Sequence, residues 1–355
     1  MNETINYNIH DILTFQIIRR KTRDFLRNLN FPFSYFETKE TVKDPDITII
    51  NDSFTPDLKE CNIVDHKYFI KENYFFCKDS ENGAQWKVEI TGFEKNKTIV
   101  KFNGKGKKLS SFFIPDFLSQ NLILRPLIEY KLTKKGYYLL HSAALHKNGK
   151  AYLFAGRGGS YKTSLVMDLI RNFDFIFMGD DRILITKDRV LAFPMYLPLF
   201  NFRVQELKDE NIRNIIEKIR LFKELFHNEK EKSIIPVVSH STLDVLFMLY
   251  KTNKKGPIET SLIDAEKATP ILVASNKMEM IKSPMMMGMD FGCFYKYMLA
   301  YSFIFPKSDI ASYWDCLKKN IKTILENIPI YEINLPMKYS MIISEQLNQL
   351  IKDLK

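Results

Sequence analysis

One segment of the chain carries residues whose types and spacing suit the binding of phosphate groups. Glycines let backbone N–H groups turn inward around phosphate oxygens, and the start of a helix adds partial positive charge. A lysine and a hydroxyl residue after such glycines suit the β- and γ-phosphates of a nucleotide and a Mg²⁺ ion. The segment that we expect to bind ATP on these grounds is Gly156-Arg157-Gly158-Gly159-Ser160-Tyr161-Lys162-Thr163-Ser164. It follows an expected strand, AYLFA, and opens an expected helix, YKTSLVMDLIRNF, as this pattern requires.

Tyr161 departs from the phosphate-loop pattern G-x-x-x-x-G-K-[ST], which has glycine at this position. A tyrosine tolerates a positive φ poorly. We therefore expect a distorted loop or a reduced affinity for nucleotide. Lys162 remains the expected phosphate ligand, and Thr163 remains an expected ligand of Mg²⁺.

Two adjacent carboxylates, Asp180 and Asp181, follow the next apolar strand along the chain. Ligands of α/β folds bind where strands end. One carboxylate there can hold Mg²⁺ while the other orients or deprotonates an acceptor hydroxyl. The alternative is an ordinary turn before RILIT, since aspartate favours turns. The glycine-rich segment nearby favours the functional interpretation.

A predicted hairpin brings His141 to the same place. Asn148-Gly149 between two apolar runs is a strong hairpin signal, because both residues tolerate a positive φ. If these two form the turn, position 147 pairs with 150, and His141 comes to lie opposite Gly156. A histidine in an apolar strand is often only a core residue, so a structural role for His141 is the alternative.

The elements that must position these side chains divide the sequence into two expected domains. Residues 1–115 are predicted to form a small, mostly β domain. Within it, a helix near residues 11–28 is expected to precede the strands. Its expected strands are rich in β-branched and aromatic residues and are separated by Asp, Asn, Gly and Lys; they are 46–50, 67–77, 85–93 and 97–104. Residues 116–355 are predicted to be α/β. Its expected elements include a helical segment at 115–135 and strands at 244–250 and 331–335.

Three further features of the second domain have possible roles at the site. Residues 206–228 are predicted to form an amphipathic helix, which either packs on the core or binds a partner. The run from Met285 to Met289 either fills a core gap or lines an adaptable groove. Arg203 is a candidate contact to phosphate or acceptor, because a guanidinium binds phosphate through two hydrogen bonds.

Composition limits the classes of partner. Lys plus Arg exceed Asp plus Glu by 52 to 42, and this net charge of +10 favours anionic ligands or acidic partners, although solvated lysine-rich faces give the same balance. The sequence does not favour nucleic acid as a partner, because no block of five basic residues occurs. The four cysteines are scattered without a CxxC pair, which indicates a reducing compartment. The start of the chain does not resemble a signal peptide, and the apolar stretch 291–305 is too short to span a bilayer. We expect a cytoplasmic protein without membrane contact.

The order LHSAAL (140–145), AGRGGSYKTS (155–164) and MGDD (178–181) resembles the HPr kinase/phosphorylase and phosphoenolpyruvate carboxykinase superfamily. It looks most like the HPr-kinase-like peptide and small-molecule kinases. The resemblance covers residues 115–190 well and 190–355 only in general character. It implies an α/β fold, with a P-loop kinase core of the HPr-kinase/PEP-carboxykinase type and a small β-rich N-terminal domain. No phosphorylase-specific loop is identifiable in 191–203, and the chain is shorter than a carboxykinase, so neither of those activities is expected.

The resemblance also implies roles for individual residues. Thr163 and Asp181 would hold Mg²⁺, Asp180 would act as the base near the acceptor hydroxyl, and His141 would orient it, while Lys162 would neutralise the transferred phosphoryl group.

Three functions agree with this set of residues. The first is an ATP- and Mg²⁺-dependent kinase that transfers the γ-phosphoryl group to a hydroxyl, in the first instance a serine of a peptide or protein. The second is a kinase for a small hydroxyl compound such as free serine or a sugar. The third is a catalytically degenerate nucleotide-binding or scaffold module, which Tyr161 favours and the intact Asp pair disfavours. A homo-oligomer is compatible with any of them.

Overall fold

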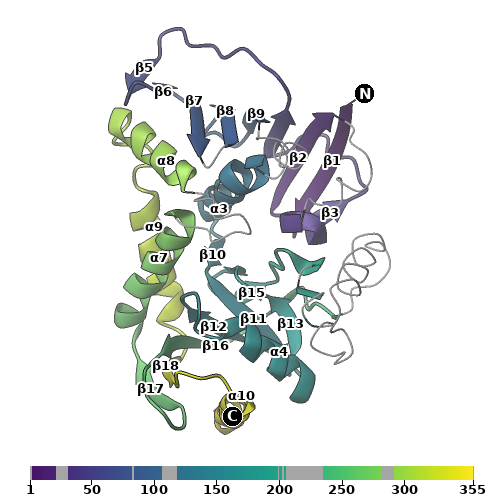
Figure 1. Cartoon of the computed structure of the whole chain (residues 1–355), viewed down its shortest axis with the longest axis vertical. Helices are drawn as coiled ribbons and strands as arrows, with labels where there is room; N and C mark the ends of the chain where they lie inside the picture. Colours follow the sequence, from purple (N-terminus) through teal and green to yellow (C-terminus); the bar gives the residue numbers. More distant parts are fainter. Residues whose placement is uncertain are drawn as a thin grey trace. The chain divides into compact units, whose positions relative to one another are not determined.

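The computed structural model describes residues 2–20, 31–81, 84–105, 118–198, 200–201, 204, 235–281 and 292–354. These residues form a mixed α/β protein with two mixed β-sheets and several helices (Figure 1). Contacts divide the chain into two compact units, each built from two stretches of sequence. The first unit is Met1–Lys135 with Lys277–Cys316, and the second is Gly136–Asn276 with Leu317–Lys355.

The first unit contains a nine-stranded sheet with the order β3-β1-β2-β4-β9-β8-β7-β6-β5. Pairing is parallel from β2 to β4 and from β4 to β9, and antiparallel elsewhere. The strands are β1 (Asn2–Ile9), β2 (Leu13–Arg20), β3 (Glu37–Thr38), β4 (Ile47–Asn51), β5 (Asn62–Val64), β6 (Tyr68–Lys71), β7 (Tyr74–Glu81), β8 (Ala84–Thr91) and β9 (Thr98–Lys105), with a short 3₁₀ helix η1 (Phe31–Phe36). The strands predicted at 46–50, 85–93 and 97–104 are confirmed, whereas the single strand predicted at 67–77 is a hairpin of β6 and β7 that turns at residues 72–73.

The helix predicted near residues 11–28 is wrong over β2, and residues 21–30 lie outside the described part of the chain. Residues 13–20 form a strand because their burial has a period of two: Leu13, Phe15 and Ile17 are fully buried. Pairing with β1 places Phe15 opposite Tyr7, with the two rings stacked 4.4 Å apart. A cross-strand aromatic pair of this kind stabilises a hairpin, not a helix.

Besides η1, three helical segments lie wholly within the described residues of this unit. They are a π-helical turn η3 (Ser119–Leu124), α3 (Arg125–Lys134) and α8 (Cys293–Ile304). The helix predicted at 115–135 is therefore confirmed over 119–134. Helix α8 packs on the sheet through Tyr297, whose ring lies 4.7 Å from that of Phe75 and whose hydroxyl accepts a hydrogen bond from Trp86 Nε1 at 3.0 Å. No described helix is long and apolar enough to cross a membrane.

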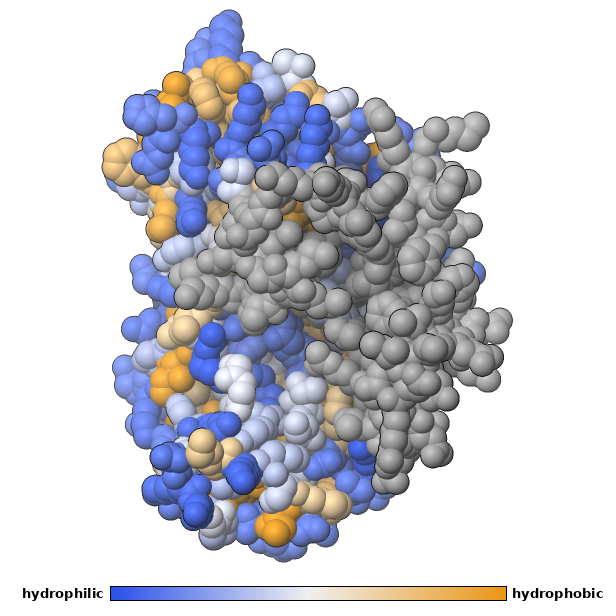
Figure 2. Space-filling model, viewed as in Figure 1, coloured by the Kyte–Doolittle hydropathy of each residue, from blue (hydrophilic) through white to orange (hydrophobic). Residues whose placement is uncertain are grey.

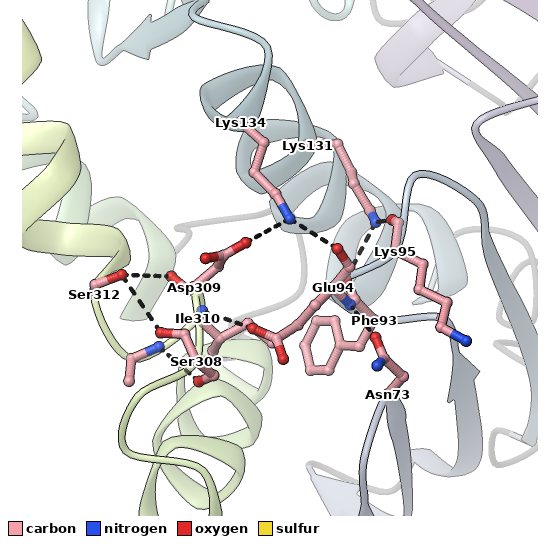
Figure 3. A network of polar contacts seen from close by, with 12 residues as sticks. Asn73, Phe93, Glu94, Lys95, Lys131, Lys134, Ser308, Asp309, Ile310 and Ser312 are labelled. Carbon is pink, nitrogen blue, oxygen red and sulfur yellow. Dashed lines mark hydrogen bonds and ion pairs between the residues drawn. The ribbon is translucent and has the colours of Figure 1, made fainter.

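A network of polar contacts centred on Glu94 joins separate segments of this unit (Figure 3). The Glu94 carboxylate accepts a hydrogen bond from the Tyr301 hydroxyl at 3.1 Å and lies 3.4 Å from the backbone N of Ile310. Lys134 donates to the Glu94 backbone carbonyl at 2.8 Å and pairs with Asp309 at 2.7 Å. Residues 293–316 are thus held to a sheet whose strands come from residues 2–105, far earlier in the sequence.

Lys131 in α3 is 3% exposed, and its ammonium donates to the backbone carbonyls of Phe93 and Lys95 (Figure 3). Burial, with the neighbouring charge of Lys134 adding to it, lowers the pKa of Lys131 to about 8. The native state of this unit therefore carries the cost of a buried ammonium at neutral pH.

The observed units differ from the domains expected at 1–115 and 116–355. Residues 119–134 and 277–316 group with the first sheet, because η3, α3 and α8 pack on its strands. The sequence gives no sign of this, since a helical segment looks the same whichever sheet it covers.

The second unit contains the other sheet, with the order β10-β14-β15-β16-β12-β11-β13 and with β18 pairing to both β16 and β17. Its strands are β10 (Tyr138–Leu140), β11 (Ser142–Lys147), β12 (Lys150–Gly156), β13 (Ile176–Gly179), β14 (Ile183–Ile185), β15 (Arg189–Leu191), β16 (His240–Lys251), β17 (Glu259–Ile263) and β18 (Ile330–Leu335). Further helices in the described part of the chain are α4 (Lys162–Asn172), α7 (Ala265–Ile281), α9 (Tyr313–Leu325) and α10 (Met341–Asp353). The predicted strands at 244–250 and 331–335 are confirmed.

The pairing of these strands brings several strand ends to one edge of the sheet. Strands β12, β16 and β18 are mutually parallel, so their carboxyl ends meet there. Strand β11 is antiparallel to both β12 and β13, so its amino end lies beside the carboxyl ends of those two strands. This edge therefore collects the residues after β12, after β13 and before β11.

Three sequence predictions fall outside the described residues: the amphipathic helix at 206–228, the methionine run 285–289, and Arg203.

Candidate functional site

The predicted hairpin is present with the expected register. Asn148 and Gly149 have φ values of 53° and 81°, as a tight turn between β11 and β12 requires. Pairing runs from Lys147 opposite Lys150 to Ser142 opposite Ala155. His141 is the residue immediately before this ladder, so it lies beside the loop that begins at Gly156.

A buried asparagine that sequence reasoning missed holds the backbone at His141. The Asn276 side chain, fully buried in α7, accepts a hydrogen bond from His141 N–H at 2.8 Å. Its amide donates to the Leu139 carbonyl at 2.6 Å. Asn276 thus satisfies two backbone groups where the chain passes from β10 to β11. No local signal identifies it, because 135 positions separate it from His141.

The glycine-rich loop after β12 has the tight conformation that its glycines allow. A Cβ on Gly156 would lie 2.5 Å from the Ser160 hydroxyl and 2.7 Å from the Leu249 carbonyl, so only glycine fits there. Gly159 has a φ of +86°, and the Ser160 N–H donates to the Arg157 carbonyl at 3.1 Å. Helix α4 begins directly after this loop, at Lys162.

Tyr161 adopts the left-handed conformation, with φ 63° and ψ 14°, at the position where the pattern has glycine. The loop thus keeps the turn at a cost of about 1–2 kcal/mol for a residue with a Cβ. Side-chain contacts offset this cost. The Tyr161 hydroxyl donates to the Met337 carbonyl, its ring centroid lies 5.2 Å from that of Tyr339, and Lys251 Nζ lies 4.8 Å from the ring centre. Lys251 is the last residue of β16, and Met337 and Tyr339 follow β18.

Lys162 points toward the start of the loop and toward His141. Its ammonium donates to the Gly156 carbonyl and lies 3.3 Å from His141 Nε2. An ammonium has no acceptor, so Nε2 must accept, and the imidazole proton is carried by Nδ1. Nδ1 lies 3.1 Å from the Asp181 carbonyl and 3.2 Å from its carboxylate. His141 therefore lies between Lys162 and Asp181, with one ring nitrogen toward each.

Thr163 and Asp180 form a second pair beside the first. The Thr163 hydroxyl, in the first turn of α4, donates to Asp180 Oδ2 at 2.7 Å, and Asp180 Oδ1 accepts from the Asp181 N–H at 3.1 Å. Burial raises the pKa of Asp180 above its ordinary value, and the hydrogen bond from Thr163 opposes that rise. A hydroxyl and a half-buried carboxylate are oxygen ligands of the kind that Mg²⁺ prefers.

The two aspartates therefore have different neighbours. Asp181 has a φ of 78°, and its side chain is 42% exposed. This conformation turns its carboxylate toward His141, whereas Asp180 faces Thr163. The close fit at Gly179, where a Cβ would lie 2.7 Å from Ile183 Cδ1 and 3.0 Å from the Arg182 carbonyl, fixes the chain just before the pair.

The other predicted loop residues lie around this centre without forming part of it. Gly158 and Ser164 are exposed, and so is Arg157, whose guanidinium lies 3.3 Å from the Ser275 carbonyl. Of the residues predicted to act chemically, the structure brings His141, Lys162, Thr163, Asp180 and Asp181 together.

Comparison with known proteins gives no match, neither to a family model nor to a curated sequence. The arguments below therefore rest on the residues and their geometry.

Proposed function

We propose that the protein is an ATP- and Mg²⁺-dependent phosphotransferase that transfers the γ-phosphoryl group to a hydroxyl. The observation that carries this proposal is the 2.7 Å hydrogen bond from Thr163 to Asp180, formed directly behind a glycine-rich loop at the start of a helix. Backbone N–H groups and the helix start attract phosphate, and the hydroxyl–carboxylate pair attracts a hard cation. Mg·ATP supplies both, and this P-loop arrangement suits an HPr-kinase-like core.

Thr163 and Asp180 are the residues that would hold Mg²⁺. Bound there, the ion neutralises phosphate charge. Lys162 serves the same purpose from the protein: its ammonium leaves the Gly156 carbonyl for the nucleotide's phosphates when they enter the loop.

Asp181 is the group best suited to accept the proton of the acceptor hydroxyl. Its carboxylate is partly exposed and lies 3.2 Å from His141 Nδ1, which orients it. This division of roles reverses the one that the family resemblance implies, in which Asp181 binds metal and Asp180 is the base. The contact between Asp180 and Thr163 supports the reversal, because the metal-binding carboxylate must lie beside the metal-binding hydroxyl.

A serine of a peptide or protein is the acceptor that we propose first, on the basis of the family resemblance. A small hydroxyl compound such as free serine or a sugar is the alternative. A degenerate nucleotide-binding or scaffold module is less well supported, since Tyr161 retains the turn of the loop and both carboxylates retain distinct partners.

The first experiment is calorimetric titration of Mg·ATP into the wild-type protein and into the Lys162→Ala and Thr163→Ala variants. We expect binding by the wild type, a large loss in Lys162→Ala, and a loss in Thr163→Ala that depends on Mg²⁺. Transfer of label from γ-labelled ATP to a panel of serine peptides, free serine and sugars then identifies the acceptor class. Absence of binding to both ATP and GTP would refute the proposal, and binding without transfer to any acceptor would favour the scaffold function.

A further inference from the structure

A cavity of about 500 Å³ lies on one face of the sheet in the first unit. Strand β7 shows which face this is, because its side chains alternate. Phe75 contacts Tyr297 of α8, so Phe76 and Lys78 point to the opposite face. In Figure 2, hydrophilic side chains surround smaller apolar patches at the top of the view, where Figure 1 shows β5 to β8. The lining residues are Phe54, Thr55, Pro56, Leu58, His66, Lys67, Phe69, Phe76, Lys78 and Lys87.

Two lysines of this cavity are placed at an energetic cost. Lys78 in β7 and Lys87 in β8 are direct cross-strand partners, and both line the cavity. Directly opposed side chains have Cβ atoms roughly 5 Å apart, and like charges at that separation destabilise a sheet. Lys87 reaches the Phe54 carbonyl, and its ammonium lies 4.4 Å from the centre of the Phe54 ring. Neither contact supplies a negative charge.

The carboxylates near the cavity have other partners. Glu89 pairs with Lys101 at 2.7 Å and also accepts the Tyr74 hydroxyl. Asp57 is paired with Lys71 at 2.7 Å, and Asp79 is paired with Lys67 at 3.4 Å. Among the described residues, no carboxylate lines the cavity. The Lys78–Lys87 pair is therefore suited to an anion from outside the chain.

Most of the remaining lining is apolar, although it also includes Thr55, His66 and Lys67, and the Lys67 ammonium pairs with Asp79. A simple inorganic anion would therefore use only part of the cavity. Leu58 is 39% exposed, Phe69 is half-buried, and Pro56 and Phe54 complete this side. Phe76, on the floor, is only 1% exposed and offers no ring face on which a nucleic-acid base could stack. The cavity thus combines the opposed Lys78 and Lys87, together with Lys67 beside its partner Asp79, with an aliphatic and aromatic wall.

We propose that this cavity binds an acidic peptide segment, with two carboxylates against Lys78 and Lys87 and an apolar side chain against Phe69 and Leu58. The chain's net charge of +10 assists the approach of such a partner. The interaction is one of recognition, with no chemical step, and it does not depend on the proposed phosphoryl transfer.

Fluorescence anisotropy with a short labelled peptide, in which glutamates flank one phenylalanine, tests the proposal. We expect the affinity to fall about fivefold to tenfold for Lys78→Gln and for Lys87→Gln, roughly the loss of one charge-assisted contact each. Lys43→Gln removes an exposed lysine of the same unit outside the cavity and serves as the matched control. Lys162→Ala should bind the peptide as the wild type does, so this result stays separate from the test of the proposed function.

Changes in the probe test the two halves of the cavity. Replacing the glutamates by glutamine, or the phenylalanine by serine, should each weaken binding. Lys78→Glu should bind the acidic peptide least and gain affinity for a version with lysine in place of glutamate. Equal binding by the wild type and Lys78→Gln would overturn the proposal, and so would a single-stranded oligonucleotide or inorganic phosphate that binds the cavity as well as the peptide does.

The thermal midpoint of the wild type, with and without the peptide, provides a measurement that needs no variant. Binding to the native state raises the midpoint, and no rise at saturating peptide contradicts the proposal. Lys78→Gln alone should melt at the same or a higher temperature than the wild type, because it removes the like-charge pair.

Discussion

The environments of Asp180 and Asp181 differ, although the two residues are neighbours in sequence. One carboxylate accepts the Thr163 hydroxyl and is half-buried, and the other lies against the His141 imidazole and is more exposed. Their roles should therefore separate on mutation. In Asp181→Asn we expect turnover to fall by a factor of about 10²–10⁴, the usual contribution of a general base, with Mg·ATP affinity little changed. In Asp180→Asn both should fall. Paired calorimetry and rate measurements check this, and equal losses of Mg·ATP affinity in the two variants would contradict it.

Asp180 should also lower the stability of the native protein. Its folded-state pKa is raised by burial, so the folded protein holds this proton more tightly than the unfolded chain does. The contribution of Asp180 to the free energy of unfolding is therefore greatest at low pH, and it falls as pH rises through the pKa of this group in the folded state. At neutral pH, Asp180→Asn should unfold at a higher temperature than the wild type, while Asp181→Asn should change the midpoint little. Differential scanning calorimetry at several pH values measures both, and an Asp180→Asn midpoint below that of the wild type refutes this explanation.

Tyr161 makes contacts through both its ring and its hydroxyl group. Tyr161→Phe removes only the hydrogen bond to the Met337 carbonyl and should cost about 1 kcal/mol of stability. Tyr161→Gly removes the positive-φ strain together with every side-chain contact, so it should leave Mg·ATP binding possible but destabilise the segment after β18. Denaturant titration compares the two variants. If Tyr161→Phe is as stable as the wild type, the hydroxyl contact does not stabilise the loop.

At the scale of single residues, the sequence identifies the candidate site by the types of its residues and their spacing. The hairpin register, and with it the place of His141 beside Gly156, follows from Asn148-Gly149 alone. The conformation of Tyr161 could not be predicted, because the contacts that offset its strain come from Lys251, Met337 and Tyr339, which are distant in sequence.

At the scale of elements, the break between β10 and β11 depends on Asn276 of α7. Asn276→Ala leaves the His141 N–H and the Leu139 carbonyl buried without their partner, which should cost about 2–3 kcal/mol. Because His141 loses this support, the Asn276→Ala variant should also lose more turnover than ATP affinity. Ser275→Ala, a change at a buried neighbour on the same helix, is the control and should have a small effect. A wild-type turnover in Asn276→Ala would show that His141 needs no such support.

The elements themselves were predicted unevenly. Strands flanked by Asp, Asn and Gly can be predicted, because both the alternation of their side chains and the turn residues at their ends are local features of the sequence. The sequence predicts a helix that includes residues 13–20, because the period-two burial of Leu13, Phe15 and Ile17 becomes clear only when β1 is known to pair with them. The grouping of residues 293–316 with the first sheet depends on long-range contacts such as that of Tyr297 with Phe75, which no local pattern encodes.

At the scale of the whole molecule, the buried Lys131 gives the first unit a specific response to pH. Its proton is held less tightly in the folded state, with a pKa of about 8, than in the unfolded chain, where a lysine titrates near 10.4. Between these values the unfolded chain binds more protons, so stability rises with pH. From pH 8 to pH 9.5 we expect a gain on the order of 2 kcal/mol.

Urea denaturation across this pH range measures the gain, and Lys131→Met is the comparison. The variant has no ammonium at this position, so its stability should lack this rise. A parallel pH dependence in the two proteins would show that another group is responsible.

The way in which the two units share the chain has a consequence for biosynthesis. Residues 277–316 of the first unit are inserted between two stretches of the second, and β18, which completes the parallel set with β12 and β16, comes from residues 330–335. A nascent chain that ends at residue 135 lacks the helix that covers β6 to β8, and one that ends at residue 276 lacks an inner strand of the other sheet. Neither unit can therefore mature on the ribosome before nearly the whole chain has emerged. Truncations at the apparent sequence boundary near residue 115 should yield aggregating fragments, because each would expose the face that the missing segment covers.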